Sequence, residues 1–401
     1  MSVNNMSFQD AATLLNDLVG QNSGMTQIAP IANLGDYISV GTTALKTGLD
    51  PLAIGISQMV GRTIFANRPY NGALRILERT EDEWGAITRK ISAIDLDAVP
   101  ESVYALVDGQ HPDMFEVRKP KLFQTNFYGF DVWSDWVSVT RQQLKNAVLN
   151  PGDMGRLIDL VLTNQSDKME MTREAFARLT LSNLIGALYA IDENVVHLAT
   201  EYAAYVSAEL PAGVTAAEFV QLRENYTDFI RWAYARIATV SDLMVQRSAR
   251  FHTLPSDGNG GSLPLMRHTP KEDQRIFVYS GDIHQIGARV LAETFNSDMV
   301  SEKLPYTESL SYFQSIDDPQ KIQIAPAYMA ADGTITQGSA VTVDKIFAVI
   351  ADRDALGYNL HDQSVDVSPY EARGKYYNYW YHEARRYWVD TTENAVLFLM
   401  D

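Results

Sequence analysis

The sequence predicts an α+β chain in which one long helix and several antiparallel strands supply most of the core. Apolar residues recur at three- and four-residue steps over residues 153–191, which is the period of a helix. After residue 320, short β-branched and aromatic segments alternate with turn residues, as in antiparallel strands. Before residue 61, short apolar stretches are separated by glycine, threonine and asparagine, so no independent domain is expected there.

Composition excludes several classes of function. The 401 residues suffice for two or three domains, and the absence of cysteine excludes disulfides, thiolate metal sites and cysteine nucleophiles. A net charge of −17 repels phosphates, so sequence-specific nucleic-acid binding is not expected. No run approaches the roughly 18 apolar residues that span a bilayer, and the first basic residue is Lys46. We therefore expect no membrane partner and no signal peptide.

The N-terminal residues 1–61 are expected to form an arm. Ser7 can cap a short helix whose apolar face includes Phe8 and Leu15 and which ends at Gly20. The apolar content is too high for a solvated tail. We therefore expect the arm to dock on another surface, including that of a neighbouring subunit, rather than to be disordered.

An evenly charged segment follows the arm. Residues 62–131 contain nine basic and eleven acidic residues, and prolines limit helix formation there. The alternation over 123–127 and 132–139, on either side of Tyr128-Gly129, predicts a hairpin. We interpret the segment as an extended loop that pairs with other chains, and a solvated surface lobe is the alternative.

Two helices are predicted in the middle of the chain. The first, at about 153–191, would be roughly 50–60 Å long unless the polar stretch 164–168 interrupts it. Thr215 and Glu218 form a capping-box pattern, which predicts a second helix that extends to Ile237.

Strands are predicted to follow a short helix at about 282–295. The strand-like segments are 321–325, 341–350, 375–382, 384–389 and 395–400. The last two flank the turn-like residues 390–394, so we expect them to form a terminal hairpin.

No catalytic signature is present. The sequence has no phosphate-binding loop, no nucleophile elbow and no His-Glu-x-x-His motif. Histidine and acid are neighbours at His361-Asp362 and His382-Glu383, but adjacent side chains point to different sides of a strand and seldom share a metal. We therefore predict that the protein is not an enzyme and has no catalytic residue, metal site or cofactor.

Eight aromatic residues lie between Tyr370 and Trp388. Flat rings with acidic neighbours would suit a carbohydrate-binding or carbohydrate-active protein, which needs the rings on one face. Tyr376 and Tyr377 are consecutive, however, so aromatic side chains lie on both faces of the strand. This favours a strand covered by the core on one face and by a neighbouring subunit on the other.

The C-terminal third contains a series of motifs that resembles a known family. In order they are Asp352-Arg353-Asp354-Ala355-Leu356-Gly357, Ser368-Pro369-Tyr370, Tyr377-Asn378-Tyr379-Trp380, Arg386-Tyr387-Trp388 and Thr392-Glu393-Asn394-Ala395-Val396-Leu397-Phe398. This series resembles the closing strands of tailed-phage major capsid proteins with the Hong Kong 97-type fold. The upstream layout of arm, charged loop, long helix and mixed domain is similar to that family as well.

The resemblance implies a division of the chain into five parts. These are an N-terminal arm at 1–61, an extended loop at 62–130, a peripheral domain at 131–240 with its spine helix at about 153–191, a mainly axial domain at 241–350, and C-terminal strands at 351–401 that return to the peripheral domain. The axial residues 296–340 would form the tips of the rings.

The resemblance also implies a function. The chain would be a self-assembling shell subunit, in pentamers and hexamers, of an icosahedral or prolate phage head that encloses double-stranded DNA. Assembly in the host cytoplasm would use a separate scaffolding protein and a portal, and the product would be the virion. The candidate assembly contacts are Phe8, Leu15, Lys119, Lys121, Trp133, Trp136, Tyr377, Tyr379, Trp380, Arg386 and Trp388. An encapsulin-like nanocompartment would share the fold and is an alternative.

Overall fold

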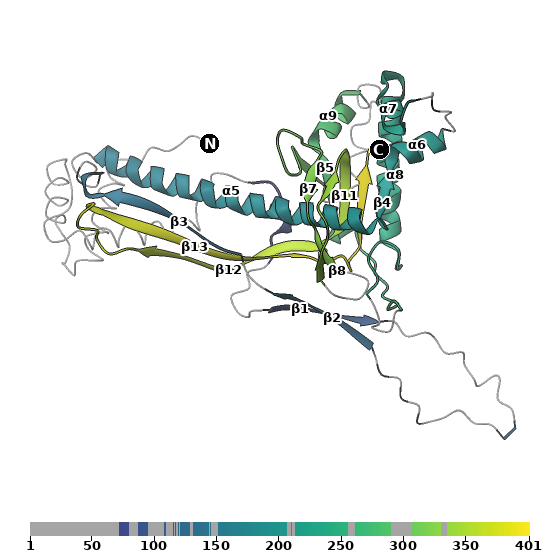
Figure 1. Cartoon of the computed structure of the whole chain (residues 1–401), viewed down its shortest axis with the longest axis horizontal. Helices are drawn as coiled ribbons and strands as arrows, with labels where there is room; N and C mark the ends of the chain where they lie inside the picture. The colour runs from purple at the N-terminus through teal and green to yellow at the C-terminus, as the bar shows by residue number, and fades with distance from the viewer. Residues whose placement is uncertain are drawn as a thin grey trace.

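A computed structural model of the chain shows two sheets joined by one long helix (Figure 1). Apart from a few single positions, the structure describes residues 72–79, 87–94, 121–128, 131–143, 151–206, 213–255, 261–289, 307–329 and 335–401. The expected N-terminal arm, with Phe8 and Leu15, lies outside the described residues.

The long predicted helix is confirmed. Helix α5 (Pro151–Ile191) has 41 residues, which corresponds to about 60 Å. Proline at its first position suits a helix start, because the missing N–H would have no partner there. The polar stretch 164–168 does not interrupt the helix, and Gln165 in it is fully buried. The helix runs along both sheets and connects them (Figure 1).

A three-stranded antiparallel sheet lies along the N-terminal part of α5. Its order is β12 (Leu356–Val367), β13 (Tyr376–Val389) and β3 (Asp131–Thr140). Helix α5 covers one face of this sheet. Phe176 of the helix packs on Tyr387 with 5.3 Å between ring centroids, and Lys168 forms an ion pair of 3.2 Å with Asp135.

A five-stranded sheet lies at the C-terminal end of α5. Its order is β4 (Val195–His197), β14 (Ala395–Leu399), β11 (Ile346–Asp352), β5 (Gln274–Tyr279) and β6 (Thr307–Leu310). The pairs β14–β4 and β5–β6 are parallel and the other two are antiparallel. All residues of β11 and β14 are buried, which fits their nearly continuous apolar sequences.

Helices cover both faces of this sheet, which explains the continuous burial. Leu397 and Leu399 belong to the core that α5 shares, while Val396 and Phe398 belong to a second core. The second core is completed by α6 (Leu198–Tyr205), α7 (Ala216–Gln221) and α8 (Arg223–Met244). Helix α9 (Ser280–Arg289) follows β5 directly. The two cores hold the sheet between two helical layers.

Four short strands complete the described elements near α5. They are β7 (Ile322–Ile324) paired with β10 (Val341–Val343), and β8 (Ala327–Met329) paired with β9 (Ile335–Gln337). Gly186 lets this region approach the helix, because a Cβ there would lie 2.6 Å from Cγ2 of Ile324 and 3.3 Å from Cβ of Pro326.

Replacing Gly186 with alanine is therefore expected to lower the free energy of unfolding by about 1–3 kcal/mol, because the added methyl group overpacks this contact. At a solvent-exposed helix position the same change would raise the free energy of unfolding by about 1 kcal/mol. The sign of the measured change therefore shows whether this contact is tightly packed. Urea unfolding measures it. Ala190→Gly, at an exposed position of α5, is the control and should cost about 1 kcal/mol. A more stable Gly186→Ala variant would contradict the expectation.

Two expected hairpins are wrong. Residues 395–400 do not pair with β13, because β14 lies between β11 and β4 in the other sheet. The turn-like residues 390–394 are buried and cross from one sheet to the other. Strand β2 (Lys121–Tyr128) likewise pairs with β1 (Ile87–Ile94), whereas β3 pairs with β13 over ten residues. Strand β14 is apolar and buried at every residue, and it pairs with β11, which is likewise apolar and buried throughout.

Other expected elements are divided. The capping box at Thr215 is confirmed, but the helix ends at Gln221 and α8 begins after Leu222, whose ψ of 138° is extended. The strand expected over 341–350 is split at Lys345, which has a φ of 57°. The two segments 375–382 and 384–389 form one strand, β13.

The division into sheets does not follow two of the implied domain boundaries. β4 and α6 to α8, within residues 195–244, pack on the five-stranded sheet, whereas the resemblance placed residues 131–240 together in the peripheral domain. β14 joins that same sheet and does not return to the three-stranded one. Strand β12 was not expected at all.

Candidate assembly surfaces

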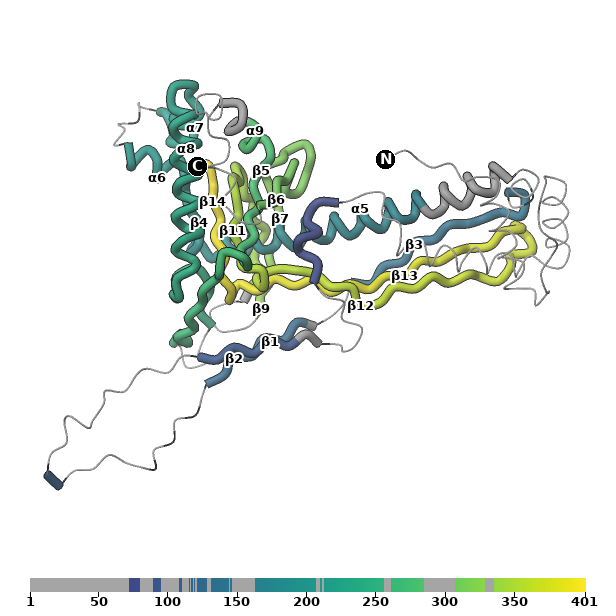
Figure 2. The backbone as a smooth tube through the Cα atoms, turned by 180° about the vertical axis from the view of Figure 1, so that it is seen from behind, coloured from purple at the N-terminus to yellow at the C-terminus, as the bar shows by residue number. Residues whose placement is uncertain are grey.

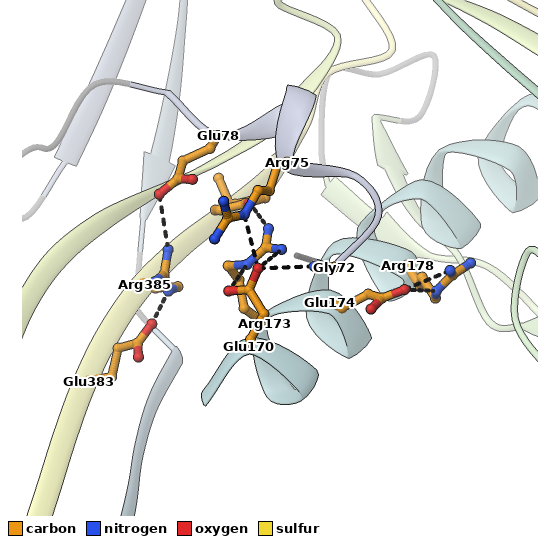
Figure 3. A network of polar contacts seen from close by, with 10 residues as sticks. Gly72, Arg75, Glu78, Glu170, Arg173, Glu174, Arg178, Glu383 and Arg385 are labelled. Atoms are coloured by element: carbon orange, nitrogen blue, oxygen red, sulfur yellow. Dashed lines mark hydrogen bonds and ion pairs between the residues drawn. The ribbon is translucent and has the colours of Figure 1, made fainter. Parts of the chain in front are cut away.

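A buried polar network holds residues 72–79 against α5 (Figure 3). The Glu170 carboxylate accepts hydrogen bonds from the backbone N–H of Gly72 at 3.1 Å and from Nε of Arg75 at 2.9 Å. Arg173 lies on the same helix face, three residues on, and donates to Glu170 at 2.8 Å. It also donates to the Tyr358 hydroxyl of β12. The network therefore joins three segments that are distant in sequence.

The charges in this network are paired. Burial by itself would raise the pKa of Glu170, but hydrogen bonds from Arg173 and Arg75 and the charge of Arg173 hold it below its ordinary value of 4.5. Nearby, Arg178 donates to Glu174 at 2.6 Å and lies 3.8 Å above the ring of Tyr312. The carboxylates of Glu170 and Glu174 are thus both paired with arginines, which indicates a structural role.

The opposite face of the three-stranded sheet carries a partly exposed aromatic row. Because side chains alternate along β13, Trp380 and His382 point away from α5. Trp136 of β3 lies opposite Trp380 with 5.0 Å between ring centroids, and His382 stacks on Trp380 at 6.5 Å. Trp136 is 53% exposed, and the Asp366 carboxylate lies 3.8 Å from His382. We call Trp136, Trp380 and His382 the tryptophan ladder.

The same sheet face is covered at its other end by strands β1 and β2, which we call the ribbon (Figure 2). Phe127 of the ribbon packs on Trp388 with 6.5 Å between ring centroids. On the inner face of the ribbon, Ser92 and Ile94 are buried, while Ile91 on its outer face is exposed. Among the described residues, the ribbon thus covers one half of the sheet face and leaves the half with the tryptophan ladder uncovered.

A groove of about 630 Å³ lies between the ribbon, α5 and strands β8 and β9. Its lining is mainly apolar and includes Phe127, Leu179 and Ile335. The ionisable residues among those that line it are Asp131, Tyr328, Tyr387 and Asp390. This arrangement suits the docking of an apolar segment better than acid–base chemistry.

Other chemistry finds little support in the described part of the chain. Among the described residues, no group of three or more histidine and acidic side chains could hold a metal ion. None of the helices in those residues is both long and apolar enough to cross a membrane. The geometry points to binding, although an exposed tryptophan ladder could in principle contact either a protein or a sugar.

Comparison with known proteins decides between a protein-binding and a sugar-binding surface. Residues 23–399 match the family model described as Phi29-like phage major capsid protein. The chain belongs to this family. It is therefore a subunit of a multi-subunit phage shell and a component of the virion. The match does not support a nanocompartment or a carbohydrate-binding protein.

A solved phage capsid shares the fold of this capsid protein. A chain in the capsid structure of Staphylococcus phage Andhra has a TM-score of 0.53 and 12% identity, covering 83% of this chain and 86% of that one. A chain in the structure of the head fibre and inner core protein gp22 of native bacteriophage P68 has a TM-score of 0.49 and 10% identity, covering 84% and 87%. No curated protein matches the sequence. The likeness to the phage Andhra capsid chain confirms the expected fold class.

The structure separates the expected assembly contacts of this capsid protein into three groups. Lys119, Lys121 and Trp136 are exposed, whereas Trp133, Trp380 and Trp388 are partly buried. Tyr377, Tyr379 and Arg386 are buried inside the subunit, at most 2% exposed. The subunit's own fold covers these three side chains, and contact of them with a neighbour stays a prediction.

Proposed function

We propose that this capsid protein forms pentamers and hexamers that close into a phage head, and that the tryptophan ladder is one surface on which a neighbouring copy docks. The observation that carries the proposal is the half-covered sheet face. The ribbon covers one end of that face, while Trp136 stays 53% exposed at the other. Large exposed aromatic surfaces on a soluble chain mark interaction sites, because water contact with them is unfavourable.

The neighbour's extended loop is the segment that suits this surface. In the described part of the loop, Phe115 is 82% and Val117 is 76% exposed, and Lys119 is also exposed. These alternate residues offer two apolar side chains and one cation. The ladder offers aromatic rings beside the Asp366 carboxylate, so the surfaces are complementary in polarity and charge.

Replacing Trp136 with serine is expected to reduce closed shells at least tenfold while leaving the subunit folded, because the change removes apolar contact area at an exposed position. Negative-stain electron microscopy of the expressed protein counts the shells, and circular dichroism checks the fold. Trp136→Phe keeps an aromatic ring and should restore most of the yield.

Wild-type levels of shells from Trp136→Ser would remove the ladder from the assembly contacts. A wild-type protein that gives neither shells nor ring-shaped capsomers, even with the neighbouring phage head genes co-expressed, would overturn the assembly proposal itself.

We further propose how the subunit is divided into domains and how it assembles. The sheet β12-β13-β3 with the N-terminal part of α5 would be the peripheral domain, and the five-stranded sheet with α6 to α9 the axial domain. A separate scaffolding protein and a portal would guide assembly in the host cytoplasm. The net charge of −17 fits a wall that encloses DNA without gripping it, and the subunit would have no catalytic role.

A further inference from the structure

A buried ion-pair cluster joins the ribbon to the body of the subunit. Nζ of Lys90, on the inner face of β1, lies 2.6 Å from Oδ2 of Asp390 and 2.5 Å from Oε1 of Glu393. Both carboxylates are almost completely buried, whereas the Lys90 side chain is 23% exposed. Within the described residues, the ion pairs between the ribbon and the body are those of Lys90.

Arg267 completes the cluster from the body side. Its Nη2 donates to the Ser92 hydroxyl of β1 at 2.9 Å and lies 3.1 Å from Oε1 of Glu393. Its Nε donates to the backbone carbonyl of Thr392 at 3.2 Å. Two cations and two carboxylates therefore balance at the point where the ribbon contacts the body.

The carboxylate side of the cluster is rigid. The second oxygen of Asp390 accepts hydrogen bonds from the backbone N–H of Thr392 at 2.9 Å and from its hydroxyl at 2.6 Å. Asn394 contacts His252 at 3.1 Å, and the backbone N–H of Asp390 donates to Ala355 at 2.7 Å. Residues 390–394 connect β13 of one sheet to β14 of the other. The carboxylates of Asp390 and Glu393, which we call the socket, therefore lie at the junction of the two sheets.

We propose that Lys90 is a positioning residue, and that its insertion between Asp390 and Glu393 fixes the angle at which the ribbon leaves the body. The ribbon strands β1 and β2 are the two ends of the extended loop, so this angle sets the direction in which the loop departs. A two-stranded ribbon is only marginally stable by itself and takes its orientation from what it packs against. Removing Lys90 leaves two buried carboxylates facing a single arginine, which favours separation of the ribbon from the socket.

The angle can be measured on the single full-length chain. The sequence has no cysteine, so Ala93→Cys on the ribbon and Ala190→Cys on α5, both exposed, accept spin labels specifically. Pulsed electron paramagnetic resonance should give one narrow distance distribution for the parent. Lys90→Met should broaden it at least twofold, and Lys90→Arg should restore it. Lys271→Met, which removes a 2.6 Å pair with Asp242 within the body, should leave it unchanged.

The double variant Asp390→Asn with Glu393→Gln tests the socket from the other side and should also broaden the distribution. If Lys90→Met does not fold, this double variant decides. An unchanged distribution in the folded variant overturns the positioning role. The consequence of the Lys90 positioning role for assembly rests on the proposed function. Lys90→Met should lower the shell yield and broaden the distance distribution, whereas Trp136→Ser should lower the shell yield and leave the distance distribution narrow. Failure of the wild type to assemble would overturn only the proposed function, because the distance measurement needs no shell.

Discussion

Replacing Arg173 with methionine is expected to lower the free energy of unfolding of the subunit by about 3–5 kcal/mol, because it removes one partner of a buried ion pair. Arg173 is 2% exposed and donates to both Glu170 and the Tyr358 hydroxyl. Methionine fills part of the space but leaves Glu170 with Arg75 and the N–H of Gly72 as its donors. Urea unfolding at pH 7 measures the loss.

The same variant should change the response to acid. In the folded wild type the pKa of Glu170 lies below 4.5, because the hydrogen bonds and charge of Arg173, with Arg75, outweigh its burial. A lowered carboxyl pKa contributes stability above the pKa of the unfolded chain, and that stability is lost as pH falls through the folded value. Wild type should therefore lose this contribution below about pH 4.5, and Arg173→Met should lose less over the same range.

Arg231 offers a matched control on α8. It is an arginine with an acidic helix neighbour, Asp228 at 3.5 Å, but both side chains are exposed. Arg231→Met should change the free energy of unfolding by no more than about 0.5 kcal/mol. A loss below about 1 kcal/mol for Arg173→Met would show that the network in Figure 3 contributes little to the fold.

Local periodicity was sufficient for the elements that are stabilised within one segment. Helix α5 could be predicted because apolar residues recur at three- and four-residue steps, and Ala177, Leu181, Leu184 and Leu188 among them are buried in the core. The capping box of Thr215 and Glu218 depends on residues three apart and was also visible in the sequence. The break between the helices at Leu222 was not visible in the sequence. It depends on how α7 and α8 each pack on the shared core, and no local pattern indicates that.

Residues 390–394 show why the strand pairing could not be predicted. Their composition is that of an exposed turn, yet all five are at most 7% exposed. The side chains of Asp390 and Asn394 are bound by Lys90, His252 and Thr269, which lie more than 100 residues away in the sequence. A buried polar segment requires such partners. Without knowledge of them, the sequence favoured a hairpin.

The candidate site was predicted in part for a similar reason. The aromatic cluster drew attention to β13, and the expectation of rings on both faces agrees with buried Tyr379 on one face and Trp380 on the other. Which face stays exposed depends on α5 and the ribbon, so the burial of Tyr377, Tyr379 and Arg386 could not be predicted from the strand alone. The Lys90 cluster was missed, because its partners are 300 residues apart and one more charge in a charged segment carries no signal.

Replacing Asp282 with asparagine is expected to stabilise the subunit at pH 8 by about 2–4 kcal/mol, the free energy of keeping a carboxyl protonated across about three pH units. Asp282 lies in the first turn of α9 and is 4% exposed. It accepts a hydrogen bond from Gln320 at 3.0 Å, and the hydroxyl of Tyr226 also contacts it. Burial raises its pKa to about 7, against 3.8 in the unfolded chain, and these hydrogen bonds oppose the rise without cancelling it.

The direction of this pH dependence follows from proton binding to Asp282. Between pH 3.8 and 7 the folded chain holds a proton on Asp282 that the unfolded chain has released, so stability falls as pH rises through this window. Asparagine is neutral at every pH, so its advantage should be absent near pH 4, grow through pH 6 and reach its maximum above pH 7. Urea unfolding at pH 4, 6 and 8 checks this slope. Asp318→Asn, at an exposed position, is the control. An Asp282→Asn effect that is equal at all three pH values would mean that this carboxyl is not protonated in the fold.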